Sequence, residues 1–183
     1  MYCYIRLGVM DTIDKIRLGM NQILHQIVLI NKKYIRQFTA TLLPMWWLSM
    51  HDTSYDVAKV ARASFNAAVP EVKRSDIVAT HSPSVFKLIV DVLKSTPSSL
   101  ATDHGFGGSN DGDETERYNR VSVMCVSGIG GILSLVSVYV SVSNSEAVSD
   151  TGPNVGVDVD GVKLSVYDSV RSIVSEKAFW KRM

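Results

Sequence analysis

The sequence predicts an α+β fold, in which an N-terminal helical region packs with a C-terminal antiparallel β-sheet of about four strands and a terminal helix. Apolar residues recur at helical spacing through the first half of the chain, whereas valines alternate with small polar residues in the second half. A glycine-rich, acidic stretch separates the two patterns. We therefore expect three parts, a net basic helical region over 1–94, a loop or linker over 95–119 and a strand-rich part over 120–183, the first and last packing as one compact unit.

The strongest periodic pattern predicts a helix over residues 11–38. Large apolar residues recur there at alternating spacings of three and four, which is the a/d pattern of a coiled-coil seam. Additional leucines and valines widen this stripe, which favours packing inside the domain over a free zipper. The stripe is the first predicted self-association surface, and its members are Ile13, Ile16, Met20, Ile23, Ile27 and Ile30.

Three further helices are expected in the first half. Pro44 should end or kink the chain's first helix, because proline lacks the amide proton that a helix interior needs. Ser82 and Pro83 have the sequence pattern of a helix N-cap followed by the first helical residue. The expected helices cover residues 53–68, 71–80 and 83–94.

Two adjacent tryptophans and three nearby basic residues suggest a surface that contacts an anionic layer. Lys32, Lys33 and Arg36 would suit a lipid headgroup region, with Trp46 and Trp47 at its boundary with the acyl chains. The alternative for the tryptophan pair is a place in the core, which is where large aromatic side chains supply most of their contact area. The second role is the more ordinary one for such a pair.

The second half is expected to form strands. No charged residue occurs from Val121 to Ser145, and strict valine–serine alternation in this run predicts strands over 120–127 and 132–143. Val138 and Val140 would lie on one strand face and extend the self-association surface, because two-sided small-polar strands pair readily with another chain. The alternative is a membrane-spanning helix over about 123–142, which the length and lack of charge would allow.

The last part of the chain predicts a hairpin and a helix. Asp160-Gly161 lies between two alternating runs within 155–166, which is a strong signal for a two-residue turn. The apolar spacing over 168–181 then predicts the terminal helix.

The net charge of +1 hides an asymmetry. Residues 1–94 hold 12 basic and 7 acidic side chains, whereas residues 95–183 hold 7 and 11. This balance excludes a globally basic nucleic-acid binder but leaves RNA binding by the basic N-terminal half as an alternative. The two cysteines have no zinc-type spacing, and the N-terminus lacks the apolar stretch of a signal peptide, which favours a reducing intracellular compartment.

No spacing of nucleophile, base or metal ligand indicates a catalytic site, so we expect no enzyme activity, cofactor, metal or small-molecule substrate. The sequence therefore predicts a non-enzymatic structural or assembly protein that acts by self-association as a homo-oligomer and by partner binding. An alternative is a peripheral membrane-surface layer protein of the virus-matrix type, which would bridge anionic lipid and a nucleoprotein. The membrane-spanning and RNA-binding alternatives above complete the set.

Overall fold

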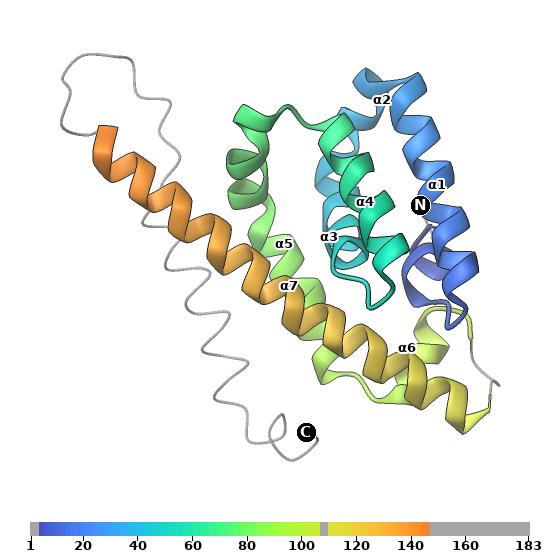
Figure 1. The fold of residues 1–183 in the computed structure, drawn as a ribbon. Helices are drawn as coiled ribbons and strands as arrows, with labels where there is room; N and C mark the ends of the chain where they lie inside the picture. Colours follow the sequence, from blue (N-terminus) through green and yellow to red (C-terminus); the bar gives the residue numbers. More distant parts are fainter. Residues whose placement is uncertain (1–3, 107–109, 147–183) are drawn as a thin grey trace.

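The computed structural model describes residues 4–106 and 110–146, and every regular element in them is helical (Figure 1). The elements, in chain order, are the π-helical segment η1 (Tyr4–Met10), α1 (Asp14–Ile30), α2 (Lys32–Gln37), α3 (Thr39–Met50), α4 (Tyr55–Ala68), the 3₁₀ turn η2 (Glu71–Lys73), α5 (Arg74–Lys94), α6 (Pro97–Asp103) and α7 (Asp111–Glu146). The predicted α+β class is therefore wrong for the described residues, which contain helices and no strand.

Helix α3 is the centre of the bundle. Nine of its twelve residues are buried, and it contacts α4, α5, α7 and η1. A helix that is apolar on all sides has to be buried on all sides, so its sequence explains its place. Pro44 lies inside α3 and does not end it. The cost of about 3 kcal/mol for an interior proline is offset by the burial of the helix that contains it.

The helices around α3 follow the predicted boundaries in part. The first expected helix is broken at Asn31, whose side chain caps α2 by accepting a hydrogen bond from the Tyr34 amide at 3.1 Å. Helix α4 matches the prediction over 53–68 within two residues at its start. Helix α5 continues through Ser82 and Pro83, and the Ser82 hydroxyl donates to the Ala79 carbonyl instead of capping a new helix.

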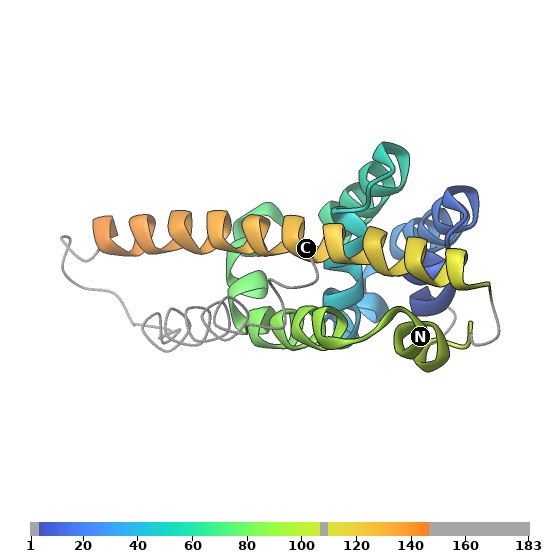
Figure 2. The ribbon, with the colours of Figure 1, turned by 90° about the horizontal axis from the view of Figure 1, so that it is seen from below.

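Helix α7 replaces both the predicted strands and much of the predicted loop. It is 36 residues long, and it crosses α6, α3 and α5 as one continuous rod (Figure 2). Residues 120–127 and 132–143 are thus helical. The expected loop over 95–119 also contains α6, which Thr96 caps by accepting from the Ser99 amide. The predicted hairpin and terminal helix lie outside the described residues.

The membrane-spanning alternative is also corrected. Within residues 4–106 and 110–146, no helix combines the length and the hydropathy that crossing a bilayer requires.

Candidate functional site

The apolar stripe predicted on α1 is not the face that packs into the bundle. The buried positions of α1 are Arg17, Asn21, Leu24 and Val28, whereas the stripe lies about 100° away around the helix at 100° per residue. Buried positions at spacings of three and four carry the contacts with α4. Because two of these four buried residues, Arg17 and Asn21, are polar, a search for apolar spacing selects the neighbouring, isoleucine-rich face of α1 instead.

Five isoleucines remain on the outside as a result. We call this set the α1 stripe: Ile13, Ile16, Ile23, Ile27 and Ile30, of which Ile23 is 54% exposed and Ile30 is 82% exposed. Met20, the sixth residue of the predicted seam, is half-buried near η1. Single exposed apolar residues are common, but a run of large ones along one helix face marks an interaction surface. The structure therefore leaves this predicted self-association surface open to a partner.

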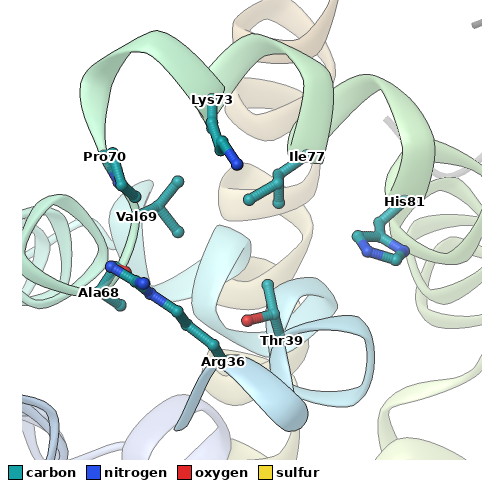
Figure 3. Close-up of a pocket in the computed structure, with 8 residues that line it drawn as sticks. All are labelled: Arg36, Thr39, Ala68, Val69, Pro70, Lys73, Ile77 and His81. Atoms are coloured by element: carbon teal, nitrogen blue, oxygen red, sulfur yellow. The ribbon is translucent and has the colours of Figure 1, made fainter. Parts of the chain in front are cut away.

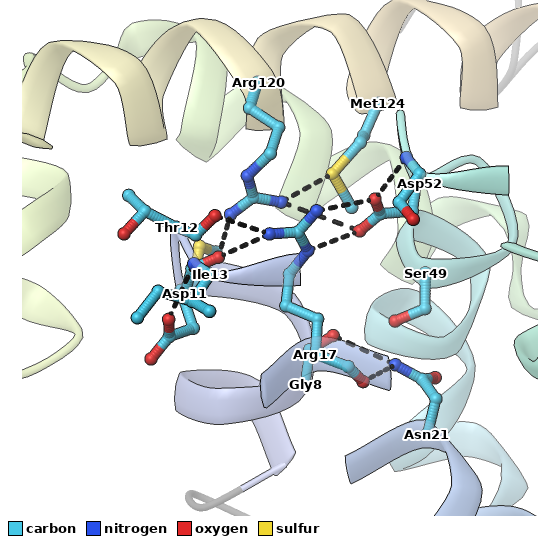
Figure 4. Close-up of polar contacts among 12 residues, drawn as sticks. Gly8, Asp11, Thr12, Ile13, Arg17, Asn21, Ser49, Asp52, Arg120 and Met124 are labelled. Carbon is cyan, nitrogen blue, oxygen red and sulfur yellow. Dashed lines mark hydrogen bonds and ion pairs between the residues drawn. The ribbon is translucent and has the colours of Figure 1, made fainter. Parts of the chain in front are cut away.

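A buried ion pair explains why the polar face of α1 turns inward. The Arg17 guanidinium donates two hydrogen bonds of 2.9 Å to the two oxygens of Asp52, and the side chains of both residues are almost fully buried (Figure 4). Asp52 also accepts from the Ser54 amide at 2.8 Å, just before α4. A bidentate pair of this kind satisfies both charges in a buried site. The pair joins α1 to the start of α4.

Helix α7 adds two further arginines to this joint. Arg120 lies 3.7 Å from the Asp52 carboxylate and donates to the Asp11 carbonyl at 2.9 Å (Figure 4). Arg117 donates to the Met10 carbonyl at 2.9 Å. Burial and the charge of Arg17 lower the pKa of Arg120 to about 10, and Asp52 opposes this effect. Arginines thus satisfy carbonyls at the end of η1, where helical elements leave acceptors unpaired. We call the cluster of Arg17, Asp52, Arg117 and Arg120 the arginine joint. It holds η1 and α7 against α1.

A second polar contact holds the other end of η1. The Tyr4 hydroxyl donates to Asn21 at 2.9 Å and lies 3.2 Å from the Ser49 hydroxyl, so it connects η1 to α1 and α3. Asn21 in turn donates to the Gly8 carbonyl at 3.1 Å. Burial raises the pKa of the Tyr4 hydroxyl far above its ordinary value, so it acts only as a neutral hydrogen-bonding group. The buried polar residues of α1, Arg17 and Asn21, therefore have a structural role. Because they point inward, the α1 stripe faces outward.

The two tryptophans proposed as lipid contacts lie in the core. Trp46 is fully buried and donates to the Ala61 carbonyl at 3.1 Å, and Trp47 donates to the Gly128 carbonyl of α7 at 3.0 Å. Their alternative role as a core pair is confirmed. The basic residues grouped with them, Lys32, Lys33 and Arg36, are exposed on α2. The predicted lipid-contact surface is therefore divided, with its basic residues exposed on α2 and its tryptophans buried in the core.

The remaining candidates lie apart from one another. Val138 and Val140 belong to α7, in a part whose side-chain surroundings are not described. Cys125 is fully buried, and burial raises the pKa of its thiol to about 12. Across residues 4–106 and 110–146 there is no group of three or more histidine, cysteine or acidic side chains placed to hold a metal ion.

Comparison with known proteins identifies the family. The family model for the N-terminal domain of the E3 ubiquitin-protein ligase listerin matches residues 1–183, which is the whole chain. The chain belongs to the listerin N-terminal domain family. The E3 ubiquitin-protein ligase listerin of Xenopus tropicalis is 25% identical over 182 residues, covering 99% of this chain and 9% of that protein. Listerin of Gallus gallus is 26% identical over 102 residues, covering 55% of this chain and 6% of its own length.

The chain therefore spans less than a tenth of the length of the listerins that it matches. No solved structure is a significant match. Membership of the listerin family overturns the prediction of a non-enzymatic structural or assembly protein, together with the virus-matrix alternative, because the relatives are ubiquitin ligases and hence enzymes. Nothing in the family description supports the RNA-binding alternative. The predicted homo-oligomer stays a prediction.

Proposed function

We propose that this chain is a docking domain of an E3 ubiquitin-protein ligase, and that its α1 stripe binds a partner protein. The family supplies the ligase context, since the matched listerins carry that activity in their names. The observation that carries the docking role is the row of exposed isoleucines described above. A ubiquitin ligase has to bind other proteins in order to modify them, and an aliphatic helix face suits such a contact.

The rigidity of the stripe supports this role. A docking surface gains affinity when it is held in its bound shape beforehand, because less conformational entropy is lost on binding. Arg17 and Asn21 fix α1 by buried hydrogen bonds to Asp52 and Gly8 on the face next to the stripe. The isoleucines therefore project from a helix that is anchored on its inner side.

The burial of Cys125 argues against a covalent role for this thiol. A thiol that accepts ubiquitin as a thioester has to be accessible and partly ionised at neutral pH. Cys125 is fully buried with a pKa raised to about 12, so its thiol contributes packing between α7 and its neighbours.

The test is a stripe variant with two acidic substitutions, Ile23→Asp together with Ile27→Asp. Both side chains are largely exposed, so the fold should persist, and circular dichroism checks this. The matched control combines Lys15→Gln with Gln22→Asp, which changes the charge of α1 by the same amount at two exposed positions on another face of the helix. Each protein is expressed as part of the gene product that carries this chain, in cells from which that gene has been deleted.

We expect the stripe variant to reduce ubiquitin conjugation to other proteins by about tenfold, since two interface residues of this type contribute roughly 1.4 kcal/mol or more together. Self-ubiquitination of the purified ligase should be unchanged. Equal conjugation by the stripe variant and the charge-matched control would refute the docking role. A parallel loss of self-ubiquitination would also refute it, because the stripe would then support the ligase's own activity.

A further inference from the structure

A pocket away from the α1 stripe lies between three helical segments. It has a volume of about 310 Å³ and is lined from α2 and the start of α3, from the end of α4, and from the η2–α5 segment (Figure 3). This volume is at the lower end of the range for ligand sites, so it suits one or two side chains of a peptide. The lining residues are Arg36, Thr39, Ala68, Val69, Pro70, Lys73, Ile77 and His81.

The polar part of this lining is basic. Arg36 and Lys73 carry positive charge from opposite walls, His81 adds an imidazole, and no acidic side chain is among the lining residues. Figure 3 shows the Lys73 amine pointing toward the middle of the lining residues and the Arg36 side chain extending toward Ala68. The nearest acidic residues along the chain, Glu71 and Asp76, are exposed and do not line it. The pocket therefore favours an anionic ligand.

Arg36 is held in position for such a ligand. Its Nε donates to the Ala68 carbonyl at 3.0 Å, which fixes the plane of the guanidinium at the end of α4. The two terminal nitrogens then remain for a carboxylate, whose two oxygens match the guanidinium fork. Thr39 is buried, and Figure 3 places its hydroxyl in the pocket beside Arg36.

The rest of the lining is apolar. Ala68, Val69, Pro70 and Ile77 make up this hydrocarbon wall. Ala68 and Val69 are buried, so Pro70 and Ile77 supply its accessible part. A ligand that fills this site should thus carry an aliphatic group next to an acidic one. Free phosphate would leave the hydrocarbon wall uncovered, whereas a leucine–glutamate pair in a peptide would cover it and reach Arg36.

We propose that this pocket binds a short acidic peptide segment, whose aliphatic side chain packs on Pro70 and Ile77, beside Val69, and whose carboxylate pairs with Arg36 and Lys73. The site uses residues outside the α1 stripe. Its failure would leave the docking role of the stripe unaffected, and the converse also holds.

The test is a titration of the full 183-residue chain, labelled with nitrogen-15, with the peptide acetyl-Leu-Glu-Leu-Glu-amide. We expect amide shifts centred on Val69 and Ile77 and a dissociation constant below about 1 mM. The glutamine counterpart of the peptide should bind at least about tenfold more weakly, because the charge-assisted bonds are lost. Raising the salt concentration should weaken binding of the acidic peptide, since the site is partly open.

Two variants and a control localise the site. Arg36→Gln and Lys73→Gln should each weaken binding by about fivefold to tenfold, at roughly 1 to 1.4 kcal/mol for each charged contact. The Lys73 amine forms no ion pair or hydrogen bond with the residues that the structure describes, so its variant remains informative if Arg36→Gln disturbs the fold. Lys59→Gln, on the exposed side of α4, is the matched control and should leave binding unchanged.

The proposal is overturned by equal binding of the glutamine peptide, by an unchanged dissociation constant in Lys73→Gln, or by shifts that do not include Val69 and Ile77. It is also overturned if inorganic phosphate binds as tightly as the acidic peptide, because the pocket would then be a simple anion site.

Discussion

Replacing Asp52 by asparagine tests the buried arginine joint, which determines how α1 presents its stripe. Asp52→Asn keeps the shape of the side chain but removes the negative charge that Arg17 contacts through two bonds of 2.9 Å and that Arg120 approaches to 3.7 Å. Two buried guanidinium groups would then lack their carboxylate. Breaking a buried ion pair in this way costs about 3–5 kcal/mol, and asparagine retains one acceptor, so we expect about 3 kcal/mol.

This loss is large for a domain of this size, whose free energy of unfolding should lie between about 5 and 15 kcal/mol. With a urea m-value of about 2 kcal/mol/M, the midpoint of unfolding should fall by about 1.5 M. The assay is urea unfolding followed by circular dichroism. Asp91→Asn, at an exposed position of α5, is the control and should stay within about 0.5 kcal/mol of the unsubstituted protein.

A double-mutant cycle identifies the partner. In an Arg17→Met background, Asp52→Asn should cost at least about 1 kcal/mol less than in the unsubstituted protein, because the pair is already broken. An unfolding midpoint for Asp52→Asn equal to that of Asp91→Asn would show that the Asp52 carboxylate does not stabilise the fold. Additive costs in the cycle would show that Asp52 does not act through Arg17.

Three further predictions concern the contact of α3 with α7. A Cβ at Gly131 would lie 2.8 Å from the His51 ring, whereas a Cβ at Gly130 would meet nothing within 4 Å. Gly131→Ala should therefore lower the free energy of unfolding by about 1 kcal/mol, and Gly130→Ala should raise it by about 1 kcal/mol, as measured by urea unfolding. Burial lowers the pKa of His51 below 6.5, so the unfolded state binds more protons as the pH falls through about 6.5. The free energy of unfolding should therefore drop between about pH 7.5 and 5.5, and a His51→Gln variant should lose less. In a Cys3→Ser background, Cys125 should react with a thiol reagent only at the rate of global unfolding, and rapid labelling of the folded protein would contradict its burial.

The helical first half was predictable because its apolar residues follow helical spacing and Pro70 follows the end of α4, although Pro44 and Pro83 lie inside helices. The choice of the buried face on α1 was not predictable in the same way. Arg17 and Asn21 lie inward because Asp52 and Gly8, distant along the chain, supply hydrogen-bond partners. A prediction made from the α1 sequence alone places such polar residues in solvent. The buried positions do follow helical spacing in the sequence. Only the long-range contacts, however, show that this face of α1 is the buried one.

The failed strand prediction for α7 has a similar cause. Its buried positions run through Arg117, Val121, Met124, Gly128 and Ile132, at spacings of three and four. Two of the five are arginine and glycine, so the helical pattern is invisible in a search for apolar residues. The β-strand preference of valine is a local effect of about 1 kcal/mol or less per residue, and the packing of α7 on α3 and α5 through buried positions up to Ile132 favours the helix.

Oxidative footprinting measures whether a bound partner covers the α1 stripe. The isolated chain and the ligase bound to its protein partners are exposed to hydroxyl radicals, and the labelling of Ile23 and Ile27 is measured by mass spectrometry. We expect ready labelling of both isoleucines in the isolated chain, since they are 54% and 44% exposed, and clear protection in the complex. Equal labelling in the two states would contradict a docking role for the stripe.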